Sequence, residues 1–194
     1  MIKNIQLGFR FTKKIAWKFF LVVGFPIHFW ALLLWFQDFD TVAQRTNAWD
    51  AFGEGGYFLS YALFESVVIF AVLILILLLL PRKWDQEAVF VIAGTLYLIA
   101  AAWFMVEQGR YLPMVSPESW IGAHIQRDIT LASNTGKLLA LLIPITFIVP
   151  LYGLIRFEKA RTALTALFDR LGVLSLLYLF LDFAGLVIVL IRII

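Results

Sequence analysis

Long runs of apolar residues alternate with short polar segments along the whole chain. Five of these runs reach or approach the roughly 20 helical residues that a hydrocarbon core of about 30 Å requires. They cover residues 17–36, 57–80, 88–106, 138–156 and 171–192. The pattern therefore predicts an all-α, polytopic membrane bundle of five transmembrane helices.

The composition agrees with this pattern and limits what else the chain can contain. Of the 194 residues, 62% are hydrophobic and 15% are charged, whereas soluble domains are about 45–50% apolar and 25% charged. Spans and connections use nearly the whole length, so we expect residues 1–194 to form a single transmembrane domain. The absence of cysteine excludes disulfides, thiolate metal sites and thiol catalysis.

The basic residues predict an orientation for this bundle. If the N-terminus is cytoplasmic, eleven of the sixteen Lys and Arg residues lie on the cytoplasmic side. By the positive-inside rule, this asymmetry favours the N-terminus inside and the C-terminus outside. We therefore expect a multi-pass protein of a cell membrane, with the inner membrane of a bacterium as the specific location.

The polar segments between the spans are of two kinds. Residues 1–14 and 157–172 carry apolar residues at helical spacing, with most charges on the opposite face. Both segments fit short helices that lie on an anionic membrane surface. The acidic segment 37–56, in contrast, is predicted to be a solvated loop on the outer side.

Asp182 raises the main question about function, because it lies inside the last predicted span. A charge at the bilayer centre costs at least about 2.5 kcal/mol. Gly172, Ser175, Tyr178, Asp182 and Gly185 follow one another at spacings of 3, 3, 4 and 3, so one helix face carries them all. Small and polar residues on one stripe are typical of a face that packs on neighbouring helices. Asp182 is therefore expected to point into protein.

His28 and Glu65 are the other ionisable residues deep in predicted spans. With a rise of about 1.5 Å per residue, both lie roughly 12 Å from the outer boundary, and Asp182 lies roughly 14 Å from it. All three are therefore expected in one layer of the bilayer.

Prolines near this layer remove backbone hydrogen-bond donors. Pro26 precedes His28 by two residues, and Pro144 and Pro150 flank Thr146 in the fourth span. The freed carbonyls need partners in hydrocarbon. We predict a polar pocket that binds a ligand or a proton, lined by His28, Glu65, Thr146, Tyr178 and Asp182. The alternative is that each polar residue only forms hydrogen bonds between helices.

Metal and cofactor signals are weak. The stretch SPESW at residues 116–120 reads as the start of a helix, and His124 and Asp128 follow at a spacing of four. Two residues do not make a metal site, so none is expected there. The sequence identifies no cofactor, and it contains no P-loop, dinucleotide fingerprint, HExxH motif or nucleophile elbow.

Three classes of function remain open. The first is a non-enzymatic subunit or scaffold of a larger membrane assembly. The second is a protein that binds or transports a proton, a cation or a small solute through the layer of His28, Glu65 and Asp182. The third is an intramembrane enzyme that modifies lipids. The expected partners are the lipid bilayer and either other membrane subunits or further copies of the chain, and no nucleic acid is expected.

Overall fold

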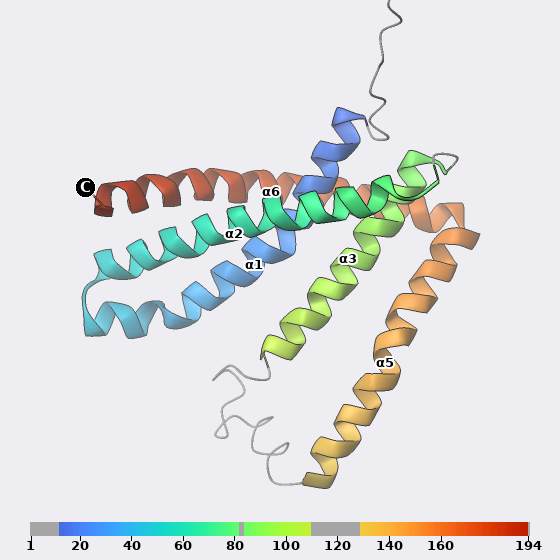
Figure 1. Cartoon of the computed structure of the whole chain (residues 1–194). Helices are drawn as coiled ribbons and strands as arrows, with labels where there is room; N and C mark the ends of the chain where they lie inside the picture. Colours follow the sequence, from blue (N-terminus) through green and yellow to red (C-terminus); the bar gives the residue numbers. More distant parts are fainter. Residues whose placement is uncertain (1–11, 82–83, 110–128, 194) are drawn as a thin grey trace, which may run out of the picture. The chain divides into compact units, whose positions relative to one another are not determined.

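Every regular element in the described part of this chain is an α-helix. The computed structural model describes residues 12–81, 84–109 and 129–193. Within these ranges, only the backbone is described for residues 109 and 129–140. These ranges contain α1 (Lys13–Arg45), α2 (Ala48–Leu78), α3 (Gln86–Gly109), α5 (Ile129–Arg156) and α6 (Glu158–Ile193) (Figure 1). The prediction of an all-α fold is confirmed for them.

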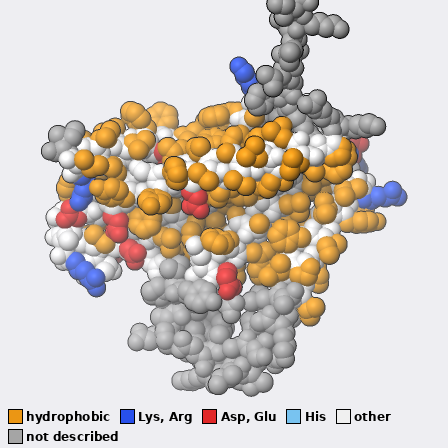
Figure 2. Space-filling model, in the orientation of Figure 1, with side chains coloured by type: hydrophobic (Ala, Val, Ile, Leu, Met, Phe, Trp, Pro, Cys, Tyr) orange, Lys and Arg blue, Asp and Glu red, His pale blue; other side chains and the backbone are white. Residues whose placement is uncertain are grey.

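The helices have the length and surface of membrane spans. By length and composition, α1, α2, α6 and residues 86–108 of α3 can each cross a membrane, whereas the described apolar part of α5, Leu141–Arg156, is shorter. Large apolar side chains such as Leu79, Phe180 and Tyr61 are 86%, 79% and 76% exposed. Hydrophobic side chains cover much of the face seen in Figure 2. Exposure on this scale indicates a membrane-embedded protein, while the fifth span and the orientation stay predictions.

The described residues form two compact units. The first unit extends to Gly94 and resumes at Ala163, and the second unit consists of Thr95–Thr162. The boundaries therefore fall inside α3 and inside α6. The single domain predicted for residues 1–194 stays a prediction.

In the first unit, α1 and α2 form a hairpin whose connection is only Thr46 and Asn47. Asn47 caps α2, because its Oδ1 accepts a hydrogen bond from the Asp50 backbone N–H at 3.0 Å. Trp35 Nε1 donates to the Ala51 carbonyl at 2.8 Å and ties the two helices together. The prediction of a solvated loop over 37–56 is therefore wrong, since most of this segment is helix.

Glycine explains why the start of α2 resembles a loop in sequence but is helical in the structure. A Cβ at Gly56 would lie 3.0 Å from the carbonyl oxygen of Gly185 on α6, and a Cβ at Gly185 would lie 3.2 Å from that of Gly56. Helix backbones can approach this closely only at small residues. These glycines therefore serve helix packing, which outweighs their low helix propensity.

The last helix, α6, runs from Glu158 to Ile193 without a break. The predicted surface helix at 157–172 is therefore not separate, because the same helix continues into the predicted span. In the first unit, the buried Phe168 ring lies 5.4 Å from that of Phe90, which gives this part of α6 a protein contact. Of the other predicted surface helix, residues 1–11 lie outside the described residues.

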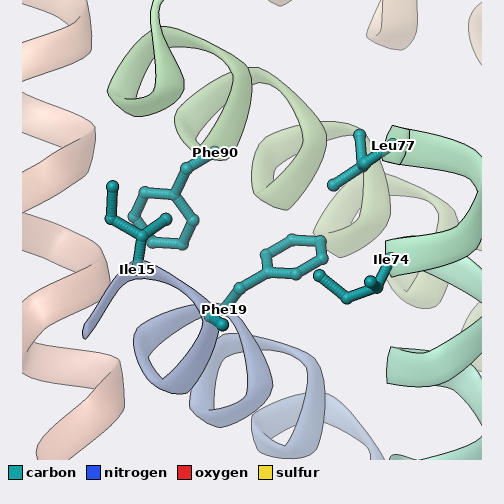
Figure 3. Close-up of a pocket in the computed structure, with 6 residues that line it drawn as sticks. Ile15, Phe19, Ile74, Leu77 and Phe90 are labelled. Carbon is teal, nitrogen blue, oxygen red and sulfur yellow. The ribbon is translucent and has the colours of Figure 1, made fainter. Parts of the chain in front are cut away.

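The core of the first unit near the connection between α2 and α3 is apolar. Figure 3 shows Ile15 and Phe19 of α1 facing Ile74 and Leu77 of α2 and Phe90 of α3. The space between these side chains is too small to hold a water molecule. Packing at this end therefore depends on apolar contacts.

The contact between Gly56 and Gly185 can be tested by adding a side chain. Gly56→Leu should lower the free energy of unfolding by about 1–3 kcal/mol, because the new side chain forces α2 and α6 apart. Gly153→Leu is the matched control, since a Cβ at Gly153 meets no atom within 4 Å. Thermal melts in detergent, followed by tryptophan fluorescence, measure both variants. Equal stability of the two variants would contradict close packing at Gly56.

Candidate functional site

The polar stripe predicted on the last span faces the interior of the first unit. Gly172, Ser175, Asp182 and Gly185 of α6 are all buried, and Tyr178 is half-buried. The prediction that Asp182 points into protein is confirmed by its 1% exposure. A face of small and polar side chains is thus the face that α6 packs on its neighbours.

His28 of α1 is the partner of Asp182. Its Nε2 lies 3.1 Å from Asp182 Oδ1 and 3.0 Å from Oδ2. Its other nitrogen, Nδ1, lies 2.7 Å from the carbonyl oxygen of Gly24, one helical turn earlier. His28 is 2% exposed, so all these contacts are shielded from the surroundings.

The partners of His28 determine where its protons lie. A carbonyl oxygen can only accept, so Nδ1 must carry a hydrogen and donate it to Gly24. Nε2 and the Asp182 carboxyl group then share one further proton, which makes the pair either imidazolium with carboxylate or imidazole with carboxylic acid. Either form is neutral as a whole, and a buried group without net charge avoids the largest desolvation cost.

A tyrosine ring covers His28, and a second polar contact joins the same two helices. The Tyr178 ring stacks on the His28 ring, with centroids 5.6 Å apart and an angle of 11° between the planes. About two turns along both helices, Ser175 Oγ donates to the Leu21 carbonyl of α1 at 2.6 Å. The site is therefore a layer of direct contacts between α1 and α6.

Two contributors to this layer are not among the site residues predicted from the sequence. Gly24 supplies the carbonyl that holds His28, and Ser66 of α2 is fully buried with its Oγ donating to the Ala62 carbonyl at 2.7 Å. A Cβ built on Gly24 would lie 3.7 Å from Ser66 Oγ. A weak signal existed for Gly24, since a histidine four residues after it can reach its carbonyl. Ser66 gives no such signal, because a serine in any helix can bond to the carbonyl four residues earlier, as Ser66 does to Ala62.

Glu65 does not join the other predicted site residues inside the first unit. Its side chain is exposed, whereas that of its neighbour Ser66 is buried. Leu59 of α2 lies against Gly185 of α6, and the two helices are antiparallel. Counting along both helices from this contact, Glu65 lies within about one helical turn of the level of Asp182. The depth predicted for Glu65 therefore fits, but the side chain points outward from α2.

Thr146 belongs to the second unit, where it forms a different contact. Trp103 Nε1 of α3 donates to Thr146 Oγ1 at 2.8 Å, and Thr146 Oγ1 donates to the Ile143 carbonyl at 2.7 Å. The structure thus brings together His28, Tyr178 and Asp182, and it gives Thr146 another partner. The predicted role of all five residues in binding stays a prediction.

The chemistry that the layer offers is the proton that His28 and Asp182 share. His124 and Asp128, the weak metal candidates, lie outside the described residues. Within the described ranges, no three His, Cys, Asp or Glu side chains gather where they could hold a metal ion. The pair of His28 and Asp182 can therefore hold a proton or join two helices.

Comparison with known proteins gives no family to which this chain can be assigned. No protein-family model matches it, and neither does any curated protein or solved structure.

Two substitutions at Asp182 separate a hydrogen bond from a charge pair. The amide of Asp182→Asn can still donate to a neutral Nε2, so its cost should be near the average of about 0.6 kcal/mol for side-chain bonds in membranes. Asp182→Leu leaves Nε2 without a partner and should cost about 1–3 kcal/mol. Chemical or thermal unfolding in detergent compares the two. A loss of about 3–5 kcal/mol in Asp182→Asn would instead indicate an ion pair whose cation is stranded.

Proposed function

We propose that this chain is a non-enzymatic subunit of a larger membrane assembly. The observation that carries the proposal is the contrast between the deep ionisable side chains of the first unit. His28 and Asp182 bind each other inside the protein, whereas Glu65 is exposed at nearly the same depth. The buried pair joins helices within the chain, and the exposed carboxylate is available to another protein.

The buried layer supports a structural role because the polar atoms of His28, Asp182 and Ser175 are already occupied. His28 uses both ring nitrogens, and the Ser175 hydroxyl bonds to the Leu21 and Leu171 carbonyls. A catalytic acid or base must reach a substrate atom within hydrogen-bonding distance. Groups that are buried and fully engaged with each other fit helix packing better than catalysis.

The exposed carboxylate supports association with another protein. A charged side chain in hydrocarbon is unfavourable by about 2.5 kcal/mol or more, and such residues almost always face protein or water. Glu65 lies among exposed apolar neighbours, Phe64 and Val68 on α2. Contact with another subunit would remove this cost, which is why the proposal is a subunit role.

Native mass spectrometry of the chain released from its own membrane tests this role. We expect the 22.2 kDa chain to appear in a complex of fixed stoichiometry with at least one other protein. The same chain produced in a foreign host is the control and should appear without that protein. A bare single chain from both sources would contradict the proposal, and so would whole multiples of the chain mass.

A second candidate function is supported by the proton that His28 and Asp182 share. A protein that binds or moves protons needs such a site within its spans. Proteoliposomes carrying a pH gradient distinguish the two candidates. For a structural subunit, we expect the wild type and Asp182→Asn to hold the gradient equally well. A faster collapse in the wild type that Asp182→Asn abolishes would favour proton transport.

A further inference from the structure

The outward side of α2 carries a regular apolar stripe around Glu65. Its large side chains recur at spacings of 4, 3, 4, 4 and 3 residues and are 44–76% exposed: Tyr57, Tyr61, Phe64, Val68, Val72 and Leu75. This spacing is the one that lets a second helix lie along the first. Glu65 is an exposed neighbour of this stripe, four residues after Tyr61 and three before Val68.

The position of Glu65 along α2 limits what can neutralise its charge. Glu65 is 17 residues from Ala48 and 13 residues from Leu78, the two ends of the helix. At about 1.5 Å per residue, Glu65 is therefore roughly 12 Å from the outer boundary predicted at residue 57, and the two helix ends are farther away. A glutamate side chain is too short to reach lipid headgroups or a soluble protein over that distance. The partner must itself enter the hydrocarbon core.

Among the described residues, the Glu65 side chain forms no hydrogen bond or ion pair. In the first unit, Lys18 near one end pairs with Asp169, and Arg192 near the other end pairs with Asp50. In the second unit, the apolar stretches 95–108 and 141–155 contain no Lys, Arg or His. A second copy of the chain that used the same face would set one Glu65 against another, which is unfavourable for like charges.

We propose that the α2 face around Glu65 binds a transmembrane helix of a different protein, and that this helix carries a lysine or arginine at mid-span. This proposal rests on the subunit role above and names the chemistry of the contact. The apolar stripe supplies the packing surface, and the ion pair fixes the depth at which the two helices meet.

Synthetic transmembrane helices provide a probe of known chemistry. One peptide is a 23-residue leucine-rich helix with a single central lysine, and its control has leucine at that position. Because the chain lacks cysteine, Thr41→Cys gives one site for a donor fluorophore, and the peptide carries the acceptor. Energy transfer in phosphatidylcholine vesicles then measures the affinity of each peptide for the full chain.

We expect the lysine peptide to bind the wild type about tenfold more tightly than the leucine peptide, which is the ratio that one hydrogen-bonded contact in a membrane can supply. Glu65→Gln, which keeps the shape of the side chain, should abolish this preference. Asp38→Asn is the matched control, because it removes one exposed carboxylate from α1 outside the stripe and should preserve the preference.

Three results would overturn the proposal. The first is equal affinity of the two peptides for the wild type, and the second is an unchanged preference in Glu65→Gln. The third is energy transfer between copies of the chain that Glu65→Gln removes, which would make a second copy the occupant. A native complex that persists in Glu65→Gln would leave the subunit role intact and place the contact elsewhere. Failure of the subunit role itself would appear as the bare chain in native mass spectrometry.

Discussion

Hydrocarbon offers no hydrogen-bond partner, so every polar atom placed in a span must find one within protein. In the first unit, the buried polar side chains of α6 meet this constraint through partners on α1. His28 lies against Asp182, and Ser175 donates to the Leu21 carbonyl. Each match works at only one register of the two helices, because a shift of one residue would rotate Asp182 away from the interface. The buried polar stripe therefore decides how the two longest helices meet.

Pairs of ionisable side chains join α6 to the hairpin at three levels, and their contributions to stability differ with their exposure. Lys18 with Asp169 and Asp50 with Arg192 are partly exposed, and such pairs contribute about 0–1 kcal/mol at most. His28 and Asp182 are 2% and 1% exposed, so separating them leaves unsatisfied polar groups in a medium of low dielectric. The central pair therefore carries the specificity, and the end pairs add alignment.

Sequence pattern predicted the helices and the buried stripe, but it missed two consequences of packing. The stripe from Gly172 to Gly185 could be predicted because small and polar residues repeat with the helical period. The helical start of α2 could not be predicted, because Gly53, Gly55 and Gly56 are typical of a loop when their neighbours in space are unknown. In the structure, Gly53 lies beside the Arg192 side chain, Gly55 beside the Trp35 ring and Gly56 beside the Gly185 backbone.

The sequence pattern also could not predict that the Glu65 side chain points outward. Adjacent residues on a helix differ by about 100° in direction, so depth along the chain does not say which of two neighbours faces inward. Ser66 faces the interior beside Gly24, and Glu65 is therefore outside. The contact between α1 and α2 decides which residue faces inward, and this contact joins residues more than 40 positions apart in the sequence.

The separation of His28 and Asp182 along the chain, 154 residues, has a consequence for biosynthesis. A ribosome that adds about 5–20 residues per second needs about 8–30 s to produce Asp182 after His28. During this interval, α1 is in place without its main partner. The bond from His28 Nδ1 to Gly24 lies within α1 and satisfies half of the imidazole from the start. The contact between α1 and α6 can form only after the helices between them have been synthesised. Assembly of the first unit is therefore complete only once α6 has been translated.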